Sequence, residues 1–228
     1  MSEPFVDVSG HLWSPLGPRG EAALLVVDVQ RDFADPVLLP WLDTAARDRV
    51  AVAVERVSAL VTAARASGVR VVWVRLEQDL EQPWNSSRWL RGMLDASDGT
   101  LREREPCVAG TPGADWYRVS PAPGEEVVTK RRYSAFHGTE LETSLHAAGT
   151  TWVVVCGMTT DCCIDATVRD GFQLGLRTVV AADATASYSL ERHRHTLDTL
   201  ALHAAVVADS DTVASTWSDL RLGRFPSG

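Results

Sequence analysis

Three reactive side chains, a carboxylate, an ammonium and a thiol, each stand shortly after an apolar run of the sequence. They are Asp28, Lys130 and Cys163. If the apolar runs are strands of one parallel sheet, their carboxyl ends meet at one edge, and the groups that follow them converge there. The sequence therefore predicts a site in which these three side chains could perform nucleophilic catalysis.

Each of the three side chains suits one part of such chemistry. A thiol at the start of a helix and near a lysine has a pKa lowered from ~8.5 toward neutrality or below, which predicts that Cys163 is the nucleophile. Asp28 is predicted to take the thiol proton and to pass it to a leaving amine. Lys130 is predicted to hold that carboxylate and to offset charge in the site. The backbone N–H groups of Thr159 and Cys163 are predicted to form an oxyanion hole.

Short valine-rich runs alternate with longer segments of helical periodicity, which is typical of a parallel sheet covered by helices. This pattern predicts an α/β fold: a single doubly wound domain whose central parallel sheet of about six strands is flanked by helices in a three-layer, Rossmann-type arrangement. Strands are expected at 23–27, 69–76, 126–129, 152–156, 178–182 and 205–207, and helices at 43–67, at 138–148, from 161 or 162 onward, at 189–203 and at the C-terminus. Residues 1–20 are expected to be an N-terminal extension of a domain at 21–228.

The periodicity is lost from 77 to 123, where tryptophans are scattered among glycine, proline and charged residues. Such a long connection is unusual in a compact domain unless it is functional, so we expect a lid or a contact between the subunits of a homo-oligomer, a dimer or a tetramer. Aromatic side chains often line small-molecule pockets, and Phe33, Trp84, Tyr133 and Phe136 are predicted to line the substrate pocket. The alternative for these side chains is core packing.

The chain has 228 residues and a formal net charge of −8, which bears on the kind of partner it can have. A net negative charge disfavours a nucleic acid or an acidic membrane surface, because both attract clustered lysine and arginine. No apolar run approaches the roughly 20 residues that cross a bilayer, and residues 1–20 lack the pattern of a secretory signal. We therefore expect a cytoplasmic protein that acts on a small molecule.

The other cysteines and two neighbouring histidines favour packing or solvent exposure over chemistry. Cys156 is expected in the core of a strand, and Cys107 is expected to be a surface or interface thiol. Cys162 is expected to be structural, because a helix turns ~100° per residue and cannot aim two adjacent side chains at one point. His193 and His195 lack the i, i+4 spacing of a helical zinc site, so a solvated face is expected. Neither a metal nor a cofactor is predicted.

Three segments, LLVVDVQRDF, VVTKRRYSAF and VVVCGMTTDCCIDATVRDGFQLG, together resemble the isochorismatase-like (cysteine) hydrolase family over most of the chain. The resemblance implies that Cys163 is the nucleophile and that Asp28 and Lys130 complete a catalytic triad within the α/β fold of that family. It also implies a cis peptide bond between Met158 and Thr159.

The resemblance is closest to the branch of the family that hydrolyses ureido, carbamoyl and other small amides. That branch implies hydrolysis of a small non-peptide C–N bond through a thioester on Cys163. Metal-binding nicotinamidases of the family carry a D-x-H motif and a further histidine after the second strand, where this chain reads RLEQD at 75–79, so no metal is implied. Two alternatives stay open: a vinyl-ether hydrolase of the isochorismatase type with Asp28 as general acid, and an inactive binding module.

Overall fold

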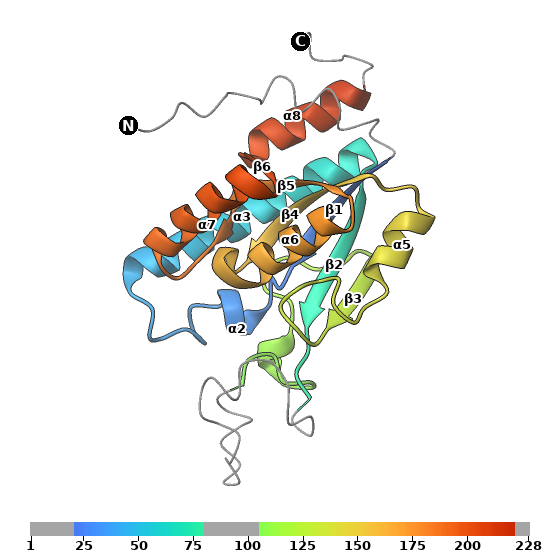
Figure 1. The fold of residues 1–228 in the computed structure, drawn as a ribbon. Helices are drawn as coiled ribbons and strands as arrows, with labels where there is room; N and C mark the ends of the chain where they lie inside the picture. Colours follow the sequence, from blue (N-terminus) through green and yellow to red (C-terminus); the bar gives the residue numbers. More distant parts are fainter. Residues whose placement is uncertain (1–20, 80–104, 222–228) are drawn as a thin grey trace, which may run out of the picture.

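The computed structural model describes residues 21–79 and 105–221, and these residues form one α/β domain around a parallel sheet (Figure 1). The sheet has six strands in the order β3-β2-β1-β4-β5-β6, and every neighbouring pair is parallel. This is the strand order of doubly wound nucleotide-binding folds, in which sites form at the carboxyl edge where the order reverses. The predicted fold class is confirmed, and the expected N-terminal extension at 1–20 lies outside the described residues.

The strands and helices follow one another almost as the periodicity predicts. The strands are β1 (Ala22–Val27), β2 (Arg70–Leu76), β3 (Glu126–Lys130), β4 (Trp152–Met158), β5 (Arg177–Ala186) and β6 (Val206–Ala208). The helices are α2 (Arg31–Ala34), α3 (Thr44–Ser67), α5 (Leu141–Ala147), α6 (Asp165–Gln173), α7 (Leu190–His203) and α8 (Ser210–Arg221), with a 3-10 turn η3 (Pro112–Ala114) and a π-helical turn η4 (Thr160–Ile164). The short helix α2 is an addition to the predicted elements, and the helix expected from 161 or 162 onward begins with the π-helical turn η4.

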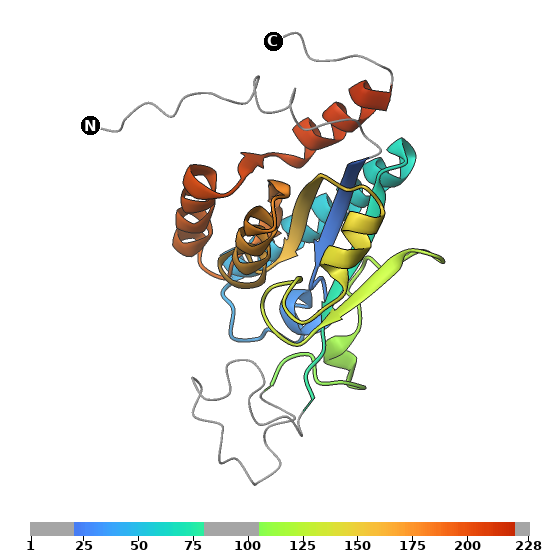
Figure 2. The same ribbon diagram turned by 45° about the vertical axis from the view of Figure 1, so that its right-hand side comes forward.

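Helices cover both faces of the sheet, which explains why its central strands are apolar at every position. Alternate side chains of β1 enter opposite cores: Leu24 and Val26 pack with α3 and α8, and Leu25 and Val27 pack with α5, α6 and α7. Figure 2 shows α5 and α6 in front of the sheet and α3 behind it. Within the described residues, no helix is long and apolar enough to span a bilayer.

Helix α3, the longest helix described, begins and ends at residues suited to those positions. The side chain of Asp43 accepts a hydrogen bond from the N–H of Ala46 at 2.7 Å, which caps the first turn. Gly68 follows the last turn with φ 67°, a left-handed conformation that glycine adopts without a steric penalty. The connection to β2 is therefore short, and β2 pairs directly with β1.

Candidate active site

Asp28 lies where the chain leaves the carboxyl end of β1 and turns toward α2. Its φ is 52°, so the backbone takes a left-handed turn there, and its N–H donates to the carbonyl of Val74 at 2.8 Å. The turn directs the side chain into the interior, where it is completely buried. The carboxylate thus occupies an apolar environment in which a partner charge is needed.

Lys130 supplies that partner charge from the edge strand β3. Its Nζ lies 2.7 Å from Oδ2 of Asp28, 3.3 Å from Sγ of Cys163 and 3.0 Å from the carbonyl of Arg132, which accepts a hydrogen bond. Like Asp28, Lys130 is completely buried. The structure therefore brings the three predicted residues together, with the ammonium between the carboxylate and the thiol.

Cys163 lies in the π-helical turn η4 that joins β4 to α6. The peptide bond between Met158 and Thr159 is cis, as the resemblance implies. The carbonyl of Thr159 then accepts hydrogen bonds from the N–H groups of Cys162 and Ile164, at 3.1 and 3.2 Å. This tight turn presents Thr159, Cys162 and Cys163 together at the carboxyl edge of the sheet.

Gly157 allows β4 to approach β1 at the base of this turn. A Cβ at this position would lie 1.9 Å from the carbonyl oxygen of Val27, and its φ of 117° is strained for any other residue. The two strands that carry Asp28 and Cys163 meet here, since Gly157 is paired with Val27. A side chain at this glycine would separate the carboxylate from the thiol.

The buried charges of the site perturb one another. Burial raises the pKa of Asp28, although the charge of Lys130 acts in the opposite direction. Burial lowers the pKa of Lys130, but the negative charges of Asp28 and Cys163 outweigh it, so the net pKa is raised. Lys130 is therefore a permanent cation, and the carboxyl of Asp28 is poised to accept a proton.

The prediction of a lowered thiol pKa for Cys163 is wrong for the resting protein. A hydrogen bond with the thiol of Cys162, burial, and the negative charge of Asp28 together raise the pKa of Cys163, against the attraction of Lys130. The expectation considered how the helix start and Lys130 lower the thiol pKa, but it did not consider how burial and the carboxylate of Asp28 raise it. The thiol consequently holds its proton until another group takes it.

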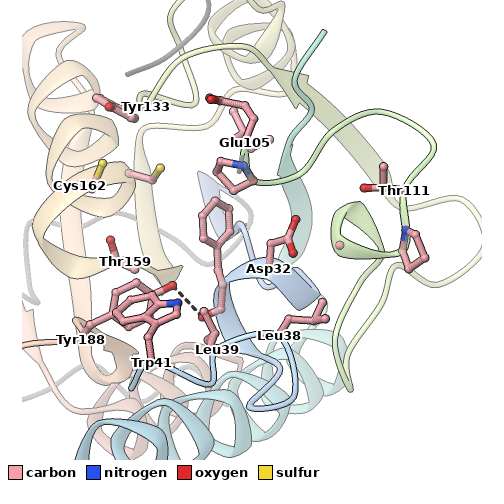
Figure 3. Close-up of a pocket in the computed structure, with 16 residues that line it drawn as sticks. Asp32, Leu38, Leu39, Trp41, Glu105, Thr111, Tyr133, Thr159, Cys162 and Tyr188 are labelled. Carbon is pink, nitrogen blue, oxygen red and sulfur yellow. Dashed lines mark hydrogen bonds between the residues drawn. The ribbon is translucent and has the colours of Figure 1, made fainter. Parts of the chain in front are cut away.

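A cavity of about 680 Å³ opens beside this cluster (Figure 3). In Figure 3, Cys162 and Tyr133 lie on one side, Trp41 and Tyr188 at the foot, and Asp32 and Thr111 on the opposite side. The residues that line the cavity are Asp32, Phe33, Leu38, Leu39, Trp41, Leu76, Glu105, Pro106, Thr111, Pro112, Gly113, Tyr133, Thr159, Cys162, Cys163 and Tyr188. The volume is in the range that small-molecule sites have, and Cys163 is among the residues that line the cavity.

The four predicted pocket aromatics have different outcomes. Phe33 and Tyr133 line the cavity. Phe136 does not: it is 8% exposed and packs in the core on the side of α5 and α6, where its ring lies against Gly171, so this prediction is corrected. Core packing was the alternative interpretation of the sequence, and it describes Phe136. Trp84 lies outside the described residues.

Two side chains of the first motif position the cavity wall, and the sequence analysis did not assign them this role. The buried amide of Gln30 donates to the carbonyls of Leu76 and Ala114, at 2.9 and 2.8 Å, and accepts from the N–H of Leu76 at 2.8 Å. Oδ2 of Asp32 accepts from the N–H of Cys107 at 2.7 Å. Both polar residues lie between Asp28 and Phe33, two residues predicted to belong to the site, and this position was the signal in the sequence that could have indicated their role.

An aromatic pair that the sequence analysis missed forms the foot of the cavity. The rings of Trp41 and Tyr188 pack edge to face with centroids 5.1 Å apart. The hydroxyl of Tyr188 donates to the carbonyl of Phe33 at 3.1 Å. The two residues follow α2 and β5, so only the tertiary fold places them together.

The three cysteines other than Cys163 occupy different environments. Cys156 is buried in β4, as expected, and its thiol lies 3.6 Å from the carbonyl of Leu25. The expectation of a surface or interface thiol at Cys107 is wrong, because it is completely buried between Asp32 and η3. Cys162 lines the cavity beside Cys163, so the structural role expected for it is also corrected. The π-helical turn changes the rotation per residue on which that expectation depended.

Within 21–79 and 105–221, no group of three or more histidine, cysteine, aspartate or glutamate side chains is arranged to hold a metal ion. The solvated face expected for His193 is corrected, because its Nδ1 lies 2.8 Å from the hydroxyl of Thr160. Burial, Arg49 and Arg194 lower the pKa of this histidine, and Asp161 opposes them. The imidazole is therefore part of the structure around the π-helical turn.

The sequence matches a family model and is similar to proteins of known description. Residues 22–212 match the model of the Isochorismatase domain. The ureidoacrylate amidohydrolase RutB of Methylobacterium radiotolerans is 31% identical over 211 residues, which cover 86% of this chain and 76% of the relative. The protein of the same description from Stutzerimonas stutzeri is 34% identical over 183 residues, 72% of this chain and 69% of the relative.

Solved structures show the same fold. A cysteine hydrolase from Pseudomonas syringae pv. phaseolicola superposes with a TM-score of 0.74 at 26% identity, covering 96% of this chain and all of the other. N-carbamoylsarcosine amidase from Thermoplasma acidophilum superposes with a TM-score of 0.64 at 25% identity, covering 84% of this chain and 97% of the other.

Proposed function

The chain belongs to the isochorismatase family of hydrolases, and from that premise we propose that it is a cysteine-dependent hydrolase of a small non-peptide amide, ureide or carbamoyl compound. The observation that carries the proposal is the position of Lys130 Nζ, 2.7 Å from the carboxylate of Asp28 and 3.3 Å from the thiol of Cys163. The names of the ureidoacrylate and N-carbamoylsarcosine relatives support this substrate class.

The first step of the proposed mechanism forms a thioester. Sγ of Cys163 attacks the carbonyl carbon of the substrate while its proton passes to the carboxylate of Asp28, which burial has made more basic. The carbonyl oxygen becomes an oxyanion, and the backbone N–H groups of Thr159 and Cys163 stabilise it. The intermediate collapses as the C–N bond breaks, and Asp28 returns the proton to the leaving ammonia or amine.

The second step releases the acid and restores the thiol. Asp28 takes a proton from a water molecule, whose oxygen attacks the thioester carbonyl at the same oxyanion site. The C–S bond then breaks, and the proton on Asp28 returns to the sulfur of Cys163. Lys130 stays charged throughout, because its pKa is raised, and it stabilises negative charge on either partner.

The cavity supports a substrate of small-molecule size with both apolar and polar parts. Phe33, Trp41 and Tyr188 provide aromatic surface, and the carboxylates of Asp32 and Glu105 provide hydrogen-bond acceptors. Aromatic and apolar walls with a few polar groups are typical of small-molecule sites. A substrate panel identifies the particular amide.

The test is ammonia release from a panel of primary amides, ureides and carbamoyl compounds, with and without a chelator. We expect the wild-type protein to release ammonia in both conditions, and Cys163→Ala to lose at least roughly 10³-fold of the rate because no thioester can form. The matched control is Cys162→Ala, which removes the adjacent thiol and leaves the nucleophile in place.

The same variants separate the alternatives. A Cys163→Ala protein that still releases ammonia contradicts covalent catalysis at this residue. A wild-type protein that releases no ammonia from the panel favours the vinyl-ether chemistry with Asp28 as general acid. Rapid alkylation of one thiol by iodoacetamide, located by mass spectrometry at Cys163, speaks against an inactive binding module, because an inert buried cysteine reacts slowly.

The assembly into a homo-oligomer stays a prediction. Phe172 and Leu174 near the end of α6 and Leu202 near the end of α7 are exposed apolar side chains of the kind that subunit contacts cover. Sedimentation analysis of the full chain tests it, and a monomer at micromolar concentration would contradict it.

A further inference from the structure

A chain of hydrogen bonds leads from α7 to the turn that carries the proposed nucleophile. Nδ1 of His193 lies 2.8 Å from the hydroxyl of Thr160, and that hydroxyl lies 2.9 Å from the hydroxyl of Thr185. Thr160 is completely buried, and Thr185 is buried beside Gly157 in the sheet. The chain therefore connects three elements, α7, η4 and β5, through one buried hydroxyl.

His193 meets this hydroxyl from a second cavity rather than from the cavity that holds Cys163. A hollow of about 320 Å³ lies at the carboxyl end of β5, between α3 and α7. His193, Thr185, Arg49, Asp183 and Leu190 are among the residues that line it. The imidazole is half-buried, so one side of its ring is fixed by Thr160 and the other side faces this hollow.

Thr160 is placed where a small movement would matter to the reaction. It directly follows Thr159, whose N–H belongs to the proposed oxyanion hole, and it begins the turn η4 that contains Cys163. A hydroxyl that is held on two sides fixes the start of this turn. Displacements of about 1 Å at a catalytic group can cost about 100-fold in rate.

We propose that His193 is a positioning residue, which acts through the hydroxyl of Thr160 to hold Thr159 and Cys163 in the geometry for attack and oxyanion stabilisation. This inference rests on the proposed function, because it gives those two residues their catalytic roles. His193 does not line the first cavity, so it does not touch the substrate in that cavity. The substrate should therefore bind normally when the imidazole is lost.

The charges around His193 favour its neutral form. Burial, Arg49 and Arg194 lower its pKa, and Asp161 opposes them. Asp161 is itself paired with Arg192 at 3.2 Å. A neutral imidazole either donates to or accepts from the hydroxyl of Thr160, and the hydroxyl of Thr185 completes the chain in both cases. The charged side chains that line the second cavity together with His193 are Arg49, Asp48 and Asp183.

The test compares three variants of the full chain on a substrate found in the panel. His193→Ala removes the hydrogen bond, and we expect kcat to fall about fivefold to tenfold with KM unchanged, the size of effect that one hydrogen bond gives. His193→Asn keeps a group that can bond the hydroxyl of Thr160 and should restore most of kcat. Thr160→Val should resemble His193→Ala, and the double variant should be no worse than Thr160→Val alone.

Chemical rescue provides a readout that a purely structural role would not give. His193→Ala opens the second cavity onto the hydroxyl of Thr160, so added imidazole can take the place of the lost ring. We expect imidazole to raise the kcat of His193→Ala and to leave the His193→Ala/Thr160→Val double variant unchanged. An unchanged kcat in His193→Ala, a change in KM alone, or a loss that neither asparagine nor imidazole restores would overturn the proposal.

The rate of alkylation of Cys163 by iodoacetamide separates this inference from the proposed function. If the wild-type protein releases no ammonia from any compound of the panel, the proposed function fails, and the alkylation rate still reports the position of the thiol. A rate that changes in His193→Ala and returns with imidazole supports the positioning role. A rate equal to that of the wild-type protein overturns it.

Discussion

Replacing Lys130 with methionine tests the buried ion pair that the proposed chemistry requires. Methionine keeps an unbranched apolar stem and removes the charge that lies 2.7 Å from Asp28. Removal of one partner of a buried pair costs roughly 3–5 kcal/mol, because the other charge is left without compensation. That is a large share of the roughly 5–15 kcal/mol by which domains are stable. It corresponds to a fall in Tm of roughly 6–20 °C for a chain of this size.

The loss of unfolding free energy in Lys130→Met should depend on pH, in a direction that follows from the pKa of Asp28. Burial already raises this pKa above its ordinary value of 3.8, and without Lys130 it rises further. The folded variant then holds a proton that the unfolded chain releases, so the contribution of this carboxyl to the free energy of unfolding is greatest below pH 3.8 and is lost as the pH rises through the folded pKa. The difference from the wild-type protein should therefore grow with pH.

Urea unfolding at several pH values, followed by the fluorescence of the buried tryptophans, measures both effects. The control is Asp28→Asn/Lys130→Met, which removes both charges and should be more stable than Lys130→Met alone. The reasoning is refuted if Lys130→Met loses less than about 1 kcal/mol, the value typical of an exposed pair. It is also refuted if the double variant loses the sum of the two single losses.

Three further predictions concern the framework of the site. Gly157→Ala should lose roughly 2–6 kcal/mol in urea unfolding, because its Cβ would overlap the carbonyl of Val27 and φ is positive; equal stability would contradict the close approach. Gln30→Ala should lower the free energy of unfolding by roughly 3 kcal/mol or more and should also reduce ammonia release, because three backbone groups lose a buried hydrogen-bond partner. Unchanged stability and unchanged activity would contradict this role of Gln30. Hydrogen bonding to Arg65 lowers the pKa of Glu125 from 4.5 to about 2, so the free energy of unfolding should fall as the pH drops through that range, and Glu125→Gln should abolish this part of the pH dependence in acid titrations.

The fold and the convergence of the site follow from patterns that are local in the sequence. Burial on both faces makes each strand a continuous apolar run, and the carboxyl ends of parallel strands share one edge. That edge brings together Asp28 and Cys163, which follow the adjacent strands β1 and β4. Residue types alone then predict which groups could react.

The features that the sequence did not predict depend on contacts between distant segments. The pKa of Cys163 is raised by the hydrogen bond with Cys162, by burial and by the charge of Asp28, and the last two depend on the tertiary fold. Cys107 was misjudged because the backbone that buries it is held by Asp32, far away in the chain. The hydrogen bond between His193 and Thr160 joins residues that are 33 positions apart in the sequence, so neither segment alone predicts it.

Because Lys130 lies on the edge strand β3, the site is assembled only when that strand is in place. In the sheet, β2 lies between β3 and β1, so the lysine side chain reaches across a whole strand to meet Asp28. Neighbouring strands are about 4.8 Å apart, and a shorter basic side chain would not cover two such spacings. Until β3 has docked, the carboxylate has no counter-ion and the thiol no neighbouring ammonium. A chain in which β3 has not docked therefore lacks the proposed catalytic arrangement, and the onset of hydrolytic activity would report that this edge of the sheet is complete.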